Sequence, residues 1–356
     1  MVLEDLKSVE WENVVEAIEV CYELGWTDGL PVVPPTVERV QQFIDYLQRP
    51  ADEILGSIPE RRRDITVAKV AANSVMAGCL PEYSPVVVAA TEAMLSKEFN
   101  LIAPSSSQGG AAVLVIVNGP ISREIGMNSK ANLFGPGNRA NATIGRAIRL
   151  ILMNSCGSIP GLFDRTLIGH PGKYTYCIAE NELETHWNPL HVERGFKAEQ
   201  NAVTVFPAWE PRQVRSAPII ESVLDSVVDV ASVLGTSLAN DDSVGDHTVP
   251  VRQGQIVITI GGPSDFWEGW SKNDVRHYLH PRIRRSLADL KKVHAIAGQL
   301  EKGDDQKFAN LVPTPDDILI VYAGSPEASG YRCAVIHSEL PKVASSAVTH
   351  AITLPH

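Results

Sequence analysis

The sequence lacks the long apolar runs and the surplus of positive charge that mark two large classes of protein. No stretch approaches the roughly 18 consecutive apolar residues that a membrane-spanning helix needs. Asp and Glu number 42 against 31 Lys and Arg, which gives a formal net charge of -11. Because no basic excess is present to neutralise phosphates, we expect neither nucleic acid nor a membrane surface as a partner.

Cysteine is scarce and never closely paired. The five cysteines are odd in number and form no CxxC motif, which argues against a disulfide framework or a zinc ribbon. They are Cys21, Cys79, Cys156, Cys177 and Cys333. Residues 1–5 show no basic region leading into an apolar run, so we expect no signal peptide and a cytoplasmic location.

What the sequence does contain is typical of a globular protein. Hydrophobic residues make up 44% of the chain and charged residues 21%. Its 356 residues suffice for one large α/β domain or two interlocked ones. Because no low-complexity linker divides the chain, we expect residues 1–356 to form one continuous α/β unit. The alternative division is a helical part over 1–100 and an α/β part over 101–356.

Three continuous apolar runs predict strands that are buried on both faces. They cover residues 112–117, 256–260 and 318–322, and each runs into a turn rich in Gly and Pro. Helical spacing of apolar residues predicts helices over 11–24, from Thr36 onward, and over 65–77, 85–96, 139–153, 218–234 and 284–300. The alternation favours a mostly parallel or mixed sheet covered by helices. The recurring strand and Gly/Pro turn is either a degenerate internal β-turn-α repeat or, as we favour, the ordinary way in which α/β strands end.

A glycine-rich turn at residues 134–138 leads into a helix that carries several polar side chains. Asn138, Arg139, Asn141 and Arg146 lie in or near its first turns. Free backbone N–H groups at a helix start, together with a guanidinium, favour a substrate carboxylate or phosphate. Neither a Walker A loop nor GxGxxG spacing is met, so no nucleotide fingerprint is present. The alternative is a helix entry in which Arg139 pairs with a local acid.

Acidic residues and a histidine gather after residue 177. Glu180 and Glu182 are two apart, as are His191 and Glu193. Such a set suits a general acid and base, or ligands for a divalent metal drawn from Glu182, His191 and Glu193. The spacing matches no established zinc motif, so the cofactor is left unassigned beyond a divalent ion. A solvated loop with internal salt bridges is the alternative.

Three further features are ambiguous. Asp28, in a Thr-Asp-Gly turn, is either a turn former or a site acid. Cys79 follows the end of a helical stretch, where the helix dipole disfavours a thiolate, so a buried structural thiol is the default interpretation. Residues 240–247 hold three acids and a histidine beside a glycine, which is closer to a surface loop than to a calcium loop.

Several segments together resemble poorly characterised bacterial proteins that are fused to, or paired with, UGSC-motif domains, where U is selenocysteine or cysteine. The segments are residues 27–36, 75–83, 118–120, 134–146, 171–174, 179–182, 190–195 and 269–276. The resemblance spans nearly the whole chain, and the motif at 135–146 is specific. The chain's own Cys156-Gly157-Ser158 lacks the final cysteine, so the resemblance leaves room for a separate UGSC-type partner protein.

The resemblance implies a single functional region without naming a reaction. Its members would be Asp28, Cys79, Glu82, Asn138, Arg139, Asn141, Arg146, Glu180, Glu182, His191, Glu193 and Arg194. We expect an enzyme, a hydrolase or lyase, that acts on a small anionic metabolite across a carbon–heteroatom bond. Arginines would hold the anion, Arg194 among them, while Glu180, Glu182 and His191 would handle protons or a metal.

Two alternatives belong to other classes. One is a redox subunit that exchanges with a thiol or selenol partner through Cys79. The other is a ligand-binding subunit without catalysis. A homo-oligomer is expected in addition.

Overall fold

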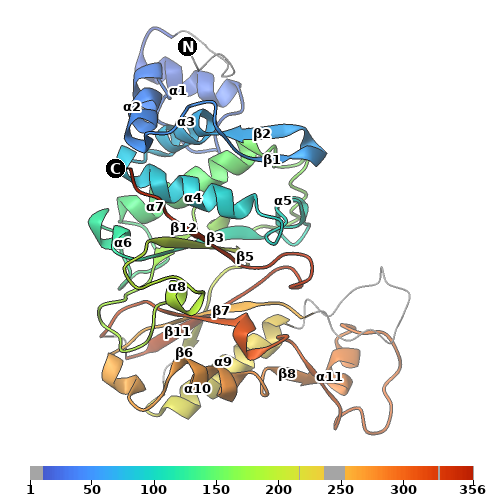
Figure 1. Ribbon diagram of the computed structural model, residues 1–356. Helices are drawn as coiled ribbons and strands as arrows, with labels where there is room; N and C mark the ends of the chain where they lie inside the picture. Colours follow the sequence, from blue (N-terminus) through green and yellow to red (C-terminus); the bar gives the residue numbers. More distant parts are fainter. Residues whose placement is uncertain (1–10, 216, 236–252, 328, 356) are drawn as a thin grey trace.

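The computed structural model describes residues 11–215, 217–235, 253–327 and 329–355. Two four-stranded sheets lie face to face, and helices cover the outer face of each (Figure 1). The layer order is therefore helices, sheet, sheet, helices, which confirms the α/β prediction.

The first sheet has the order β12-β5-β3-β4. Its strands are β3 (Ala112–Asn118), β4 (Cys177–Ala179), β5 (Ala202–Ala208) and β12 (Val348–Ala351). β3 and β4 run parallel, whereas β5 is antiparallel to both β3 and β12.

The second sheet has the order β10-β7-β11-β6. Its strands are β6 (Arg212–Arg215), β7 (Ile256–Ile260), β10 (Ile318–Tyr322) and β11 (Tyr331–His337). β7 and β10 are parallel neighbours, and β11 is antiparallel to both β7 and β6. Both sheets are thus mixed, and all three strands predicted from apolar runs are present.

The continuous apolar runs follow from this layered arrangement. Alternate side chains of a strand point to opposite faces, and here both faces are covered. On β3, Val113, Val115 and Val117 face the first helical layer, while Leu114 and Ile116 join the core between the sheets. Each fully buried aliphatic side chain of this kind stabilises the fold by about 1.5–3 kcal/mol.

The first helical layer holds most of the N-terminal part of the chain. Its helices are α1 (Val14–Glu23), α2 (Val37–Leu47), α3 (Val67–Ala77), α4 (Ser84–Met94), α5 (Ile102–Ser106), α6 (Ile121–Glu124) and α7 (Arg139–Leu150). A π-helical turn, Ile151–Ser155, continues α7, and the hairpin β1 (Ile54–Ile58) and β2 (Arg63–Thr66) lies beside this layer. The Thr36 side chain accepts a hydrogen bond from Arg39 N, so Thr36 caps α2, the helix predicted from Thr36 onward.

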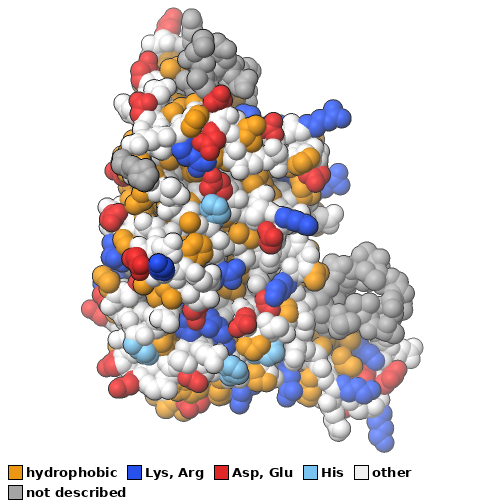
Figure 2. Space-filling view, in the orientation of Figure 1, with side chains coloured by type: hydrophobic (Ala, Val, Ile, Leu, Met, Phe, Trp, Pro, Cys, Tyr) orange, Lys and Arg blue, Asp and Glu red, His pale blue; other side chains and the backbone are white. Residues whose placement is uncertain are grey.

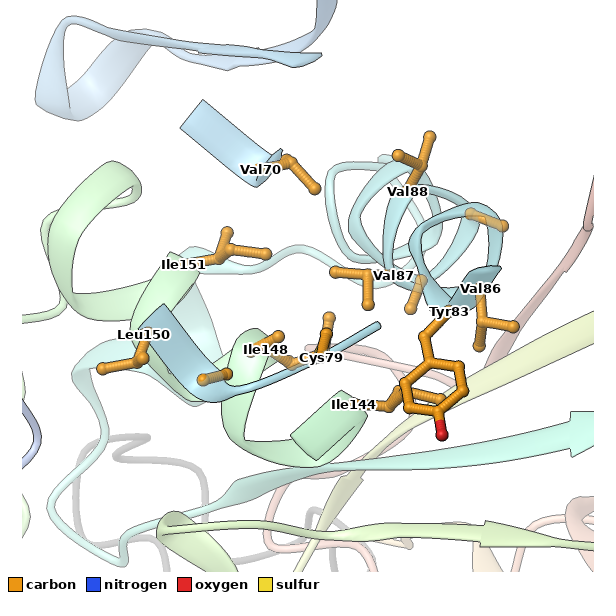
Figure 3. Packing of buried hydrophobic residues seen from close by; sticks show 14 of the residues in the cluster. Val70, Cys79, Tyr83, Val86, Val87, Val88, Ile144, Ile148, Leu150 and Ile151 are labelled. Carbon is orange, nitrogen blue, oxygen red and sulfur yellow. The ribbon is translucent and has the colours of Figure 1, made fainter. Parts of the chain in front are cut away.

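The helices before residue 100 share one core with the strands that follow. Figure 3 shows Val87 on the side of α4 that faces Ile148 of α7, whereas Val88 points away from α7. The same hydrophobic cluster includes side chains of β3, β5 and the C-terminal segment.

The second helical layer consists mainly of α9 (Ile220–Gly235) and α10 (Lys272–Leu279). The predicted helix over 284–300 is wrong in part, because Arg284–Ser286 forms β8, paired with β9 (Phe308–Asn310), and α11 covers only Leu287–Lys292. Ser286 caps α11 by accepting from Asp289 N, so the helix cannot begin earlier. It stops before His294, whose backbone is left-handed with φ 57°.

The remaining short elements are α8 (Leu190–Glu193) and 3₁₀ turns at Pro59–Arg61, Pro81–Tyr83, Pro171–Lys173, Ser264–Trp267 and Pro315–Asp317. Acidic and basic side chains are interspersed over the face of the molecule shown in Figure 2. Within the described ranges, no helix combines the length and the apolar composition that crossing a membrane requires.

Candidate functional site

The candidate site lies where β3, β4 and β10 end. Asn118 is the last residue of β3, and Glu180 and Glu182 follow β4 directly. Glu180 N donates to the Val117 carbonyl at 3.2 Å, and Asn181 N donates to the Tyr322 carbonyl at 2.7 Å. The segment 180–182 therefore joins the ends of strands from both sheets, a place where α/β proteins commonly bind ligands.

Glu180 is a buried carboxylate whose hydrogen-bonding capacity is well filled. Oε2 accepts from Asn118 Nδ2 and from Leu190 N, both at 2.7 Å. Oε1 accepts from Lys272 Nζ at 3.0 Å and from Tyr322 N at 3.2 Å. Four donors, one of them the Lys272 ammonium, thus fix the position of this carboxylate.

The network of charged side chains extends from Glu180 to Glu193, one of the predicted metal ligands. Lys272, buried at the start of α10, lies 3.6 Å from the Glu193 carboxylate. Arg276 donates to both Glu193 oxygens at 2.8 Å, in a bidentate pair. This chain of alternating charges attaches α10 and α8 to the first sheet, which gives Glu193 a structural role.

Glu182 and His191 differ from this pattern. Glu182 Oε1 accepts from Gly119 N at 2.7 Å and from Asn118 Nδ2 at 2.9 Å. Its other oxygen lies 3.7 Å from an Arg123 guanidinium nitrogen, and His191 Nδ1 lies 3.7 Å from Oε1. Both separations are too long for direct hydrogen bonds.

His191 is fully buried, and neither ring nitrogen has a hydrogen-bond partner. Asn118 Oδ1 is buried without a partner as well. Each unsatisfied buried polar atom costs about 1–3 kcal/mol, and native proteins retain few of them. Three buried polar atoms near the Glu182 carboxylate, two on His191 and one on Asn118, are therefore free to form hydrogen bonds.

Side-chain exposure decreases from Arg123 through Glu182 to His191. The Arg123 side chain is 46% exposed, that of Glu182 is 8% exposed, and that of His191 is not exposed. The order from solvent inward is a cation, a carboxylate and an imidazole.

The structure does not bring the residues at the start of α7 into this cluster. Asn138 Oδ1 caps the helix by accepting from Asn141 N at 3.0 Å, and Asn138 Nδ2 donates to the Gly126 carbonyl at 2.7 Å. Asn141 Nδ2 donates to two carbonyls, those of Asn128 and Cys177. Their polar groups thus bind backbone.

Two of the three arginines of α7, Arg139 and Arg146, also donate to backbone carbonyls. Arg146 makes a bidentate pair with Asp28 at 2.9 and 2.7 Å and also donates to the Leu30 and Pro31 carbonyls. Arg139 donates to the Gly78 carbonyl at 3.1 and 3.0 Å, at the C-terminal end of α3. Asp28 is accordingly both a turn former and the partner of Arg146.

Arg194 and Cys79 also lie outside the cluster around Glu182, and their contacts stabilise the fold. Arg194 donates to the Ala347 carbonyl at 3.0 Å. Cys79 is buried in the core cluster shown in Figure 3. Burial raises the pKa of its thiol to about 12, although the Thr143 hydroxyl and Arg139 oppose the shift. At neutral pH Cys79 is therefore a protonated thiol.

The three proposed metal ligands do not converge. Glu193 is turned toward Arg276 and Lys272, away from a shared position with Glu182 and His191. Across the described part of the chain, no group of three or more His, Cys, Asp or Glu side chains is arranged to hold a metal ion. The sequence segment 240–247 lies outside the described residues.

The sequence prediction missed roles for Asn118, Arg123, Lys272 and Arg276. Asn118 begins an Asn-Gly-Pro turn that marks the end of an apolar strand and belongs to the family resemblance, but neither observation assigns its side chain a role. Lys272 and Arg276 are four apart on one helix face, so both reach Glu193. Which carboxylate they would meet depends on the packing of α10 against α8.

Comparison with known proteins does not assign this chain to a family. No family model matches the chain, and no curated protein matches it.

Proposed function

We propose that this chain is an enzyme that uses Glu182 and His191 for proton transfer on a small anionic metabolite. The reaction class is hydrolysis or elimination across a carbon–heteroatom bond. The observation that supports it is the buried His191 imidazole, which lacks hydrogen-bond partners and lies 3.7 Å from the Glu182 carboxylate. A general acid and a general base must retain such free bonding capacity.

Each residue has a distinct role in this proposal. Gly119 N and Asn118 hold Glu182 Oε1 in place, so Oε2 is the oxygen that faces an incoming substrate. In an elimination, Glu182 takes a proton from carbon and His191 supplies one to the leaving group; in a hydrolysis, the base activates water instead. Arg123, the most exposed of the group, binds the substrate anion, a role first expected for Arg139, Arg146 and Arg194.

The structure favours this function over exchange chemistry at Cys79. That thiol is buried and its pKa is raised to about 12, so little thiolate forms at neutral pH. A cytoplasmic location, a homo-oligomer and a UGSC-type partner protein stay predictions that accompany this proposal.

The test is a turnover screen by proton NMR with purified protein. The compounds are small carboxylates and phosphate esters that carry a leaving group on nitrogen, oxygen or sulfur. We expect one compound class to be converted, and the Glu182→Gln and His191→Gln variants to lower kcat by about 100-fold or more. Glu184→Gln is the matched control, since Glu184 is two residues away and pairs with the exposed Lys130.

Two results would contradict the proposal. One is unchanged turnover in both variants. The other is tight binding of a panel compound by folded protein with no conversion, which would favour the non-catalytic ligand-binding alternative.

A further inference from the structure

A second candidate site lies apart from Glu182 and His191. It is a cleft of about 650 Å³ between the last turns of α7, the Asp28 turn and the loop over residues 160–174. That volume is typical of a metabolite site. Its walls include Pro171, Lys173 and Tyr174, from the segment 171–174 that carries part of the family resemblance and that the proposed function does not use.

The charged side chains that line the cleft are two cations, Arg149 and Lys173, and two carboxylates, Asp28 and Asp164. Asp164 binds both cations, and Asp28 pairs with Arg146. Asp164 accepts from Lys173 Nζ, at 3.0 Å to one oxygen and 2.8 Å to the other, and from Arg149 Nη1 at 3.2 Å. These three groups sum to one net positive charge, and the neighbouring Asp28–Arg146 pair is neutral. Within the described residues, Arg149 donates only through Nη1, so its other N–H groups are available.

His170 lines the cleft without adding to its charge. Its Nδ1 accepts from Gly172 N at 3.2 Å. Burial lowers the pKa of His170 below its usual value of 6.5, so the ring is neutral at neutral pH.

The rest of the lining is apolar. Met153, Pro160 and Pro171 contribute, together with Ile168 and Tyr174. The Ile168 side chain is 97% exposed and Tyr174 is 49% exposed. An apolar ligand body laid against them removes this surface from water, which favours binding.

We propose that this cleft binds a small monoanionic carboxylate with an apolar body. The carboxylate lies against Arg149 and Lys173, and the body lies against Ile168 and Tyr174. A guanidinium matches the planar carboxylate, and one net positive charge matches one negative charge. This inference does not depend on the proposed function.

The test is isothermal titration calorimetry of the full chain with benzoate, with benzamide as the neutral probe of the same shape and inorganic phosphate as the anion without an apolar body. We expect saturable binding of benzoate, binding of benzamide weaker by about ten-fold or more, and no comparable binding of phosphate. Arg149→Gln should weaken benzoate binding by about ten-fold, and its matched control is Arg139→Gln on the same helix.

A second variant keeps the test decisive if Arg149→Gln does not fold. Ile168→Ser alters only exposed surface and should weaken benzoate binding by about three-fold. Val343→Ser is its control, because Val343 is also 97% exposed and does not line the cleft. Absence of benzoate binding, equal binding of benzamide, or phosphate binding in place of benzoate would overturn the inference, as would unchanged affinity in folded Arg149→Gln and Ile168→Ser.

Discussion

The start of α7 and the end of β4 are both rich in polar side chains, yet they use them differently. At α7, the side chains of Asn138, Asn141 and Arg146 bind backbone carbonyls or Asp28. Beside the end of β4, His191 and the Oδ1 atom of Asn118, the last residue of β3, are buried without partners. Polar composition alone therefore does not locate a site. We place the candidate site where a buried imidazole without partners lies beside a carboxylate.

The reason for the difference lies in topology. α7 begins where three distant segments meet, namely the end of α3 at Gly78, the turn at Asp28 and the loop at Gly126. Backbone carbonyls in those segments need donors, and side-chain amides and guanidinium groups supply them. The motif at residues 134–146 resembles an anion site, but its polar side chains instead join three segments of the fold.

Arg146→Met should have the largest effect on stability, because it removes the contacts that join α7 to the Asp28 turn. It leaves the Asp28 carboxylate, whose side chain is 3% exposed, without its cation, and it removes the donors of two carbonyls. We expect a loss of about 3–5 kcal/mol in the free energy of unfolding, measured by urea titration.

Arg139→Met is the matched control for that experiment. Arg139 is exposed, and among the residues that the structure describes its side chain donates to the Gly78 carbonyl alone, so we expect a loss of about 1 kcal/mol. Equal losses in the two variants would show that the buried pair with Asp28 adds nothing to stability.

His191 and His337, both fully buried, extend the comparison. His337 Nδ1 donates to the Ser338 carbonyl at 2.9 Å, whereas His191 has no partner and lies next to Glu182. Burial lowers the pKa of His337 from 6.5 to about 4. Because the unfolded chain takes up this proton first, the stabilisation is complete above pH 6.5 and is lost as pH falls toward 4.

The predicted size of this pH effect is about 2 kcal/mol between pH 7 and pH 5. It should appear as a steeper fall in the free energy of unfolding for the wild type than for His337→Gln, by urea titration at both pH values. Parallel pH profiles for the two proteins would refute a role for His337.

Local patterns predicted the fold better than the site. The runs at 112–117, 256–260 and 318–322 form strands that are buried on both faces. Burial on both faces requires consecutive apolar residues, so the sequence shows it directly. The pairing of Glu180 with Lys272, or of Arg146 with Asp28, joins residues about a hundred positions apart. Such pairs depend on how layers pack, which spacing along the chain does not encode.

The motif after β4 was predictable in part for the same reason. Glu180, Glu182 and His191 do lie together, since a short strand and a short helix keep them near in sequence and in space. Their separation into structural and candidate catalytic groups depends on Lys272 and Arg123, which come from other segments.

Cys79 should show the smallest effect on stability and the clearest contrast in reactivity. With its pKa raised to about 12, the buried thiol holds little thiolate at pH 8. We expect iodoacetamide to modify it at least about 1000-fold more slowly in the native protein than in urea, followed by peptide mass spectrometry. Cys79→Ala should cost about 1 kcal/mol and leave any turnover found in the screen unchanged. Rapid modification of native Cys79 at neutral pH would instead favour thiol exchange, and it would move the reactive centre from the end of β4 to the end of α3.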